Sequence, residues 1–321
     1  MLEGKRSLRS LVRVVDYQHD AMWDGPDREA VCPCGSRRRA RSCHAAADGS
    51  WIASIPEPLL SDSPTGLSQP GCYGGAAADC SPGLTREHWI SAGVQRALSD
   101  DRQYPLISGA PWLTGGTREI SVKALASRVL CERHNQSMSR LDALGERFFR
   151  YLRDDQIALA SGEDTDVERD TFTLLSGPDL ELWLLKIFWG GLAAKAWGQH
   201  GHTINALKSE LDPATLARIL WRGAEWPSRW GLHSRYHPVD EQASPNSVAA
   251  VPWSDGVGSL WGGVIQFGAV HLSLALGEPD GAALVRPSHF ALRRRGFRGE
   301  KVFALAWPEA GHPSVTYTRT T

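Results

Sequence analysis

Four side chains that commonly bind transition metals lie within thirteen residues near the N-terminus, namely Cys32, Cys34, Cys43 and His44. Zn²⁺ prefers four thiolate or imidazole ligands arranged as a tetrahedron. Gly35 permits a tight turn after the first pair, and the adjacent Cys43 and His44 can close the site. So short a segment has no hydrophobic core, and metal binding would supply its folding free energy. We therefore predict a structural zinc site here, in preference to a chance grouping of four side chains.

A second set of ligands is spread over a longer stretch of the chain. Cys72 and Cys80 are separated by seven residues, and Cys131 and His134 follow with the Cys-x-x-His spacing of a zinc knuckle. Two such pairs, joined by a long insert, can close one tetrahedral site. The two sites together use all six cysteines, three in each, and a histidine completes each site. This pattern favours two structural Zn²⁺ ions over free thiols or disulfides.

The segment from Cys32 to His44 closely resembles the SEC-C motif, a small zinc module attached to the bacterial translocation ATPase and to many other proteins. The shared features are Cys-Pro-Cys-Gly-Ser, a basic run and a final Cys-His pair. The resemblance implies an adaptor that contacts protein partners and sometimes the ribosome. The basic run holds four arginines between Arg37 and Arg41 and no acidic residue. It could bind phosphate groups, or it could be a solvated turn of a small module.

The dipeptide Glu87-His88 lies between the two pairs of the second set, and Asn135 directly follows the Cys-x-x-His knuckle. This arrangement resembles the HNH nucleases of the ββα-metal class over roughly residues 70–155. The resemblance implies that His88 is a general base that activates water, and that Glu87 and Asn135 hold a catalytic Mg²⁺ or Mn²⁺. The leading hypothesis is therefore a metal-dependent endonuclease that hydrolyses phosphodiester bonds, with family analogy implying defence against foreign DNA.

Some positions depart from the family pattern. The asparagine expected shortly before the second knuckle is absent from Lys123–Val129, where Ser127 is the nearest polar residue. His88 could instead be a structural histidine, and Asn135 could cap the helix that it opens. Asp142 shares a helix face with Asn135 and could bind metal or pair with an arginine. The second hypothesis is a non-catalytic, zinc-stabilised adaptor or interaction protein that keeps the fold without the activity.

The pattern of apolar residues predicts an α+β protein with helices packed on an antiparallel sheet. In the N-terminal part, the spacing of Leu8, Leu11, Val12 and Val15 predicts a short amphipathic helix. A long helix is expected from Ser137 through Leu152. In the C-terminal half we expect helices at Asp179–Trp197 and at Pro213–Trp221 after the N-cap Asp212, and strands at Val248–Trp253, Trp261–Leu276 and Lys301–Trp307.

The predicted organisation has four parts. They are an N-terminal helix with the SEC-C-like zinc module (1–50), a linker rich in small residues and proline (51–70), an HNH-like ββα zinc domain (71–160) and an α+β domain of unknown role (161–321). Most of the 13 tryptophans lie after residue 180. They predict an aromatic core or an aromatic-lined pocket, and a pocket would make this half a third candidate for the active part.

The charge pattern limits the partners and the compartment that we expect. The net charge of −1 creates no global attraction to nucleic acid or to membranes. Binding to nucleic acid, with DNA favoured, would therefore need local basic patches. One is the first zinc module, and the other is Arg293–Arg298 together with Arg286. The second patch could instead be a solvated strand end whose arginines form salt bridges. The longest apolar stretch, Leu180–Trp197, contains charged residues and predicts a buried helix, not a membrane span. The N-terminus lacks the apolar core of a secretory signal, so we expect a cytoplasmic protein.

Overall fold

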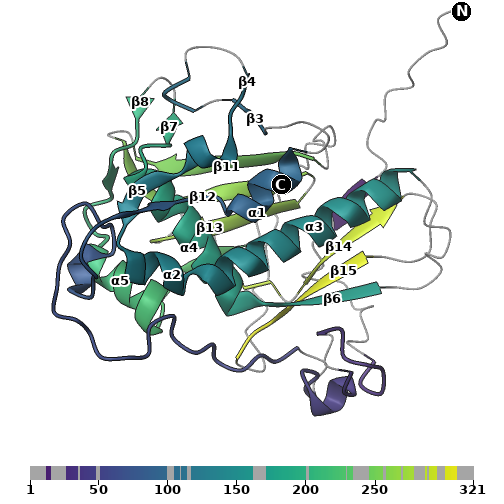
Figure 1. Ribbon diagram of the computed structural model, residues 1–321. Helices are drawn as coiled ribbons and strands as arrows, with labels where there is room; N and C mark the ends of the chain where they lie inside the picture. The colour runs from purple at the N-terminus through teal and green to yellow at the C-terminus, as the bar shows by residue number, and fades with distance from the viewer. Residues whose placement is uncertain are drawn as a thin grey trace, which may run out of the picture.

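The chain folds as an α+β protein in a computed structural model, with helices packed against largely antiparallel sheets (Figure 1). The predicted fold class is therefore confirmed at this level. The structure describes residues 12–15, 27–34, 37–47, 51–99, 105–108, 110–113, 117–161, 171–199, 202–228, 230–233, 246–255, 258–268, 270–277, 286–287, 289–294 and 301–308. Within these ranges, every helix is too short or too polar to cross a lipid bilayer.

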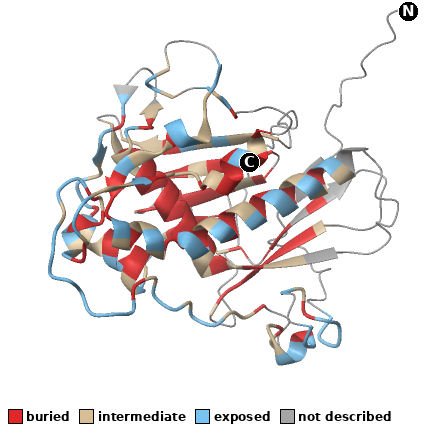
Figure 2. Ribbon diagram, viewed as in Figure 1, coloured by how far each residue is buried: buried red, intermediate tan, exposed pale blue. Residues whose placement is uncertain are grey.

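Helix α4 (Gly177–Ala193) lies at the centre of the molecule. Its residues are apolar on nearly all sides, and the whole stretch from Leu180 to Leu192 is buried. Figure 2 shows this helix buried along its length, enclosed by the surrounding helices and strands. Ser176 caps its first turn by accepting a hydrogen bond from Asp179 N. The predicted buried helix is confirmed, although it ends at Ala193 and not at Trp197.

Two sheets contact α4. The first has the strand order β1–β14–β15–β6, formed by Val12–Val15, His289–Arg294, Lys301–Ala306 and Thr171–Ser176. The second has the order β10–β13–β12–β11 with β9 beside β12, formed by Gly231–His233, Val270–Ala275, Ser259–Phe267, Val248–Ser254 and Ala206–Leu207. Only the β15–β6 and β12–β9 pairs among these are parallel. The three predicted strand regions are confirmed, and the middle one is the hairpin β12–β13.

The helix predicted around Leu8–Val15 is wrong for its second half. Residues Val12–Val15 form strand β1, which pairs antiparallel with β14 from Arg294 back to Ala291. Three of these four residues are valines, whose branched side chains favour extended backbone over helix. The distant strand β14 supplies the hydrogen bonds that a local pattern cannot reveal. Leu8 and Leu11 lie outside the described residues.

A ββα unit follows the first half of the second ligand set. Strand β2 (Thr85–Glu87) pairs antiparallel with β5 (Ser127–Leu130), and helix α2 (Glu132–Ser137) follows β5 directly. The insert between the two strands carries α1 (Ala92–Leu98), β3 (Leu106–Ile107), β4 (Arg118–Glu119) and a 3₁₀ helix, η3 (Val122–Leu125). The long helix expected near Ser137 is α3 (Ser139–Ser161), which begins just after α2 ends.

One apolar core joins both sides of residue 160. The ring of Phe148 on α3 lies 6.5 Å from the ring of Trp183 on α4, 5.5 Å from that of Phe267 on β12 and 6.2 Å from that of Phe303 on β15, measured between centroids. All four side chains belong to the same buried cluster. The ββα unit is therefore packed against the C-terminal half of the chain.

The remaining elements are short. Helix α5 (Pro213–Arg222) starts as predicted, because the Asp212 carboxylate accepts hydrogen bonds from the backbone of Ala214 and Thr215. Two 3₁₀ helices lie at Ala40–Ser42 (η1) and Gly75–Ala77 (η2), and a small hairpin joins β7 (Gly198–Gln199) to β8 (His202–Thr203).

Candidate metal centres

The structure brings together the four predicted ligands of the first site. Helix η1 turns Cys43 and His44 toward the earlier pair, because their backbone N–H groups both donate to Ala40 O, at 3.0 and 2.9 Å. His44 Nδ1 lies 3.3 Å from Cys32 Sγ and 3.1 Å from Cys43 Sγ. Cys34 Sγ lies 3.5 Å from Cys43 Sγ. All four ligand atoms fall within 4.8 Å of one another.

This module is attached at one edge of the molecule through its own small apolar cluster. Trp51 is 4% exposed and belongs to a cluster that also contains Cys32 and the β15 residues Ala304 and Ala306. Ala53 N donates to Trp307 O at 2.9 Å. Figure 1 shows the module at the lower edge of the view, below the sheet that contains β15 and β6 and apart from the central helices. The main core therefore packs without it.

The second site closes over a long sequence separation. Cys72 Sγ, Cys80 Sγ and Cys131 Sγ lie 3.4, 3.8 and 3.3 Å from His134 Nδ1. All four side chains are buried. Cys131 precedes α2 and His134 lies in it, while Cys72 and Cys80 flank η2. The pairing predicted from the sequence is thus present, and it ties the start of the ββα unit to its helix.

Both clusters fit a tetrahedral metal ion. Bond lengths of about 2.3 Å to sulfur and about 2.0 Å to nitrogen place the ligand atoms of Zn²⁺ roughly 3.5–3.8 Å apart, close to the distances found here. None of the six cysteines is in a disulfide. Burial raises the pKa values of Cys32 and Cys72 to about 12, so thiolates at these positions need a nearby cation. Burial lowers the pKa of His134 to about 4, which keeps its imidazole neutral and able to bind metal.

The His134 ring is held by packing on its outer side. Its Nδ1 faces the three thiols, and its Nε2 has no hydrogen-bond partner among the described residues. The ring packs against that of Trp221 of α5, with centroids 4.2 Å apart and planes tilted by 40°. Nearby, the buried Asp79 pairs with Arg133 at 3.1 Å and also with Arg222 of α5. The second site is thereby built into the contact between α2 and α5.

Glu87, predicted to hold a catalytic cation, is paired with an ammonium group instead. Glu87 is 4% exposed, and its Oε1 lies 2.7 Å from Nζ of Lys186, which is fully buried in α4. Asp142 of α3 also pairs with Lys186. Asp142 accepts a hydrogen bond from Ser91 Oγ at 2.5 Å, and Ser91 Oγ accepts one from Trp183 Nε1 at 2.9 Å. These five side chains form a polar network that is buried except at Asp142, whose side chain is 35% exposed.

The charges of this network stabilise one another. Burial lowers the pKa of Lys186, but the carboxylates of Glu87 and Asp142 outweigh this effect, so the pKa is raised and the amine stays protonated. Burial raises the pKa of Glu87, and Lys186 opposes that shift without cancelling it. No motif in the sequence marks Lys186 as a functional residue. A lysine within an apolar helix could have indicated it, because such a charge needs a buried partner.

His88 and Asn135 make contacts that fix the ββα unit. His88 is partly buried, with Nε2 2.9 Å from Val122 O, and burial lowers its pKa. A neutral ring that donates from Nε2 keeps Nδ1 as its basic nitrogen. Asn135 Nδ2 donates to Thr85 Oγ1 and to Arg86 O, both at 2.9 Å. Asn135 therefore joins α2 to β2.

The predicted catalytic residues do not form a further metal cluster of the kind seen at the two cysteine sites. In the part of the chain that the structure describes, groups of three or more His, Cys, Asp or Glu side chains close enough to share an ion occur only at those two sites. Neither group contains Glu87 or His88. The described residues thus support two structural metal sites and give no support to a catalytic cation.

The predicted basic patches are partly neutralised or outside the described residues. Arg39 and Arg41 of the first module both pair with the exposed Glu29, at 2.5 and 2.9 Å. Arg286 pairs with the buried Glu181 at 2.8 Å and stacks over Trp307. Residues 295–298 and the side chains of Arg293 and Arg294 lie outside the description.

Comparisons of the chain with protein-family models, with curated proteins and with solved structures found no match.

Proposed function

We propose that this protein is a zinc-stabilised scaffold that acts by binding partners, and that its ββα unit does not cut nucleic acid. The observation that carries this proposal is the buried ammonium of Lys186 between Glu87 and Asp142. A Mg²⁺ ion at Glu87 would have to approach that positive charge or displace it, and either costs free energy inside a core. Catalytic cations also keep positions open to water, whereas Glu87 is almost fully buried.

Under this proposal both cysteine sites hold Zn²⁺. Three thiolates and one imidazole suit Zn²⁺ in a closed tetrahedron and do not suit Mg²⁺, which prefers oxygen ligands. Zinc in the second site would fix α2 against the segment that leads into β2. Zinc in the first site would organise the small module at the edge of the molecule. The role of that module as an adaptor for a protein partner rests on its resemblance to the SEC-C motif.

A second candidate function is the metal-dependent HNH-like endonuclease. The position of His88 favours it, because a neutral imidazole oriented by Val122 O could act as a general base. The order β2, β5, α2 also agrees with the ββα-metal topology. Glu87 and Asn135 would then have to leave their present contacts with Lys186 and with β2 to hold Mg²⁺ or Mn²⁺.

Incubation of the full chain with supercoiled plasmid DNA or RNA, in Mg²⁺ or Mn²⁺, distinguishes the two functions. His88→Ala is the matched control, because any contaminating nuclease cuts equally in both preparations. The scaffold proposal expects no cutting above the level of His88→Ala. Cutting by the unaltered protein that disappears in His88→Ala would establish the endonuclease and overturn the scaffold.

A further inference from the structure

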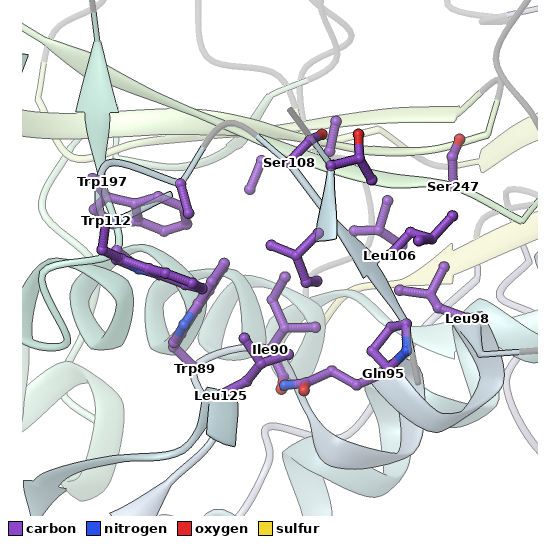
Figure 3. A pocket seen from close by; sticks show the side chains of 18 of the residues that line it. Trp89, Ile90, Gln95, Leu98, Leu106, Ser108, Trp112, Leu125, Trp197 and Ser247 are labelled. Carbon is purple, nitrogen blue, oxygen red and sulfur yellow. The ribbon is translucent and has the colours of Figure 1, made fainter. Parts of the chain in front are cut away.

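A cavity of about 440 Å³ lies between the insert of the ββα unit and strand β11. Its volume falls in the range of small-molecule sites. Three tryptophans line it: Trp89 and Trp112 from the insert, and Trp197 from the turn after α4 (Figure 3). The rings of Trp89 and Trp197 meet edge to face with centroids 4.6 Å apart. Trp112 is 49% exposed although it is a large apolar side chain, so an aromatic surface is open to a ligand.

A buried amide side chain, Gln95, lines this cavity. It belongs to α1 and is 4% exposed. Its Nε2 donates to Ile90 O at 2.5 Å, which assigns the other amide atom as the oxygen. Among the described residues, Gln95 Oε1 has no hydrogen-bond partner. A buried acceptor without a donor costs free energy, and a ligand that donates a hydrogen bond would remove that cost.

The other residues that line the cavity indicate which ligand charge it can accept. Among the described lining residues, none is charged, and the polar ones include Ser108 and Ser247 on the side opposite Gln95 (Figure 3). Buried anions need paired or hydrogen-bonded cationic groups, so a phosphate or carboxylate inside this cavity is disfavoured. An aromatic ring is favoured, because flat π-systems stack on indole faces.

We propose that this cavity binds an uncharged nitrogen heteroaromatic, a nucleobase or nucleoside, which stacks on the indole of Trp112 and donates an N–H to Gln95 Oε1. The inference does not depend on the zinc sites or on the scaffold function. The same ring could arrive as a free nucleoside or as an unpaired base of a single strand. These two sources share the ring chemistry and differ in whether the backbone contributes affinity.

Isothermal titration calorimetry on the full chain tests the proposal with adenosine, guanosine, cytidine and uridine as probes. We expect at least one nucleoside to bind with a saturable isotherm. Gln95→Leu should weaken that binding about tenfold, because it removes the acceptor without changing the shape of the side chain much. Trp112→Ala should weaken it by about tenfold or more through lost stacking. Absence of saturable binding for all four nucleosides and for short single-stranded oligonucleotides would overturn the proposal.

Two further comparisons test whether binding occurs in this cavity and whether the ring belongs to a strand. Tyr151→Ala is the matched control for Trp112→Ala, because Tyr151 is 48% exposed and lies on α3 outside the cavity. It should leave affinity unchanged. Short single-stranded homo-oligonucleotides should bind more tightly than the nucleoside only if a strand is the natural source of the ring. Equal affinities for the unaltered chain, Gln95→Leu and Trp112→Ala, with folding intact by circular dichroism, would refute the site.

Discussion

The buried ammonium of Lys186 is the single group that most constrains the ββα unit. It is fully buried in α4 and pairs with carboxylates from β2 and from α3. Removing one partner of a buried ion pair leaves an uncompensated charge, which costs more than the pair contributes. The ammonium of Lys186 therefore affects the ionisation of Glu87 and opposes the approach of a metal cation to the Glu87 carboxylate.

Replacement of this lysine should be strongly destabilising. We expect Lys186→Met to lower the free energy of unfolding by about 3–5 kcal/mol, because Glu87 and Asp142 then lose their counter-charge. Urea unfolding followed by circular dichroism measures the change. Lys195→Met, at an exposed position just after the same helix, is the control and should change stability by about 0.5 kcal/mol or less. Equal stability of the two variants would show that the network contributes nothing.

A buried histidine gives the fold a pH dependence with a defined sign. Burial lowers the pKa of His289 on β14 from 6.5 to about 4. Below pH 6.5 the imidazole of His289 is protonated in the unfolded chain but stays neutral in the folded chain. The free energy of unfolding therefore falls as the pH falls from 6.5 toward 4. Between pH 6.5 and pH 5 the loss amounts to about 2 kcal/mol. The slope of unfolding free energy against pH should be smaller in His289→Leu than in the unaltered chain, and identical slopes would contradict this.

At the scale of elements, Asn135 connects α2 to β2. Its two hydrogen bonds reach a side chain and a carbonyl on that strand. Asn135→Ala should therefore lower the unfolding free energy by about 1–2 kcal/mol. The neighbouring Gln136 is a matched control, since its amide donates to Glu132 on the same exposed helix face. Denaturant titration of Asn135→Ala and Gln136→Ala should separate the two, and equal losses would show that the link to β2 is unimportant.

The elements that the sequence predicted well are those with strong local signals. The apolar periodicity of α4, the Asp212 cap of α5 and the alternation in β11, β12 and β15 identified these elements correctly. Strand β1 was mistaken for a helix because its partner β14 lies nearly 280 residues away in the sequence. Local pattern carries no information about such a pairing.

The candidate sites also differ in how far the sequence could predict them. The ligand types and spacings of the two cysteine clusters predicted which side chains come together, because zinc chemistry restricts the ligand set. The partner of Glu87 could not be predicted, since Lys186 is brought to it only by packing α4 against the ββα unit. The cavity likewise depends on the contact between the insert and β11, which no motif marks.

In the molecule as a whole, the two metal sites differ in how much of the fold each one stabilises. The second site joins segments more than fifty residues apart and is buried within the main core. The first belongs to a separate small cluster at the edge of β15. Loss of the second should therefore affect the entire fold, whereas loss of the first should remain local.

Single cysteine variants test this difference. We expect Cys34→Ser to lose one zinc ion and to change the melting temperature of the main transition by only a few degrees. Cys131→Ser should lose the other ion and either unfold or melt far below the unaltered chain. Differential scanning calorimetry with zinc analysis on the same samples measures both quantities. Equal destabilisation by the two substitutions would contradict the assignment of the sites to separate clusters.

The most direct test of the account is the metal content of the unaltered protein. The chain should be purified without added metal, dialysed against a weak chelator and examined by elemental analysis. Two zinc equivalents per chain are predicted, one for each Cys₃His cluster. Less than two tightly held equivalents, or a different metal in their place, would contradict the claim that zinc closes these two sites and holds the ββα unit together.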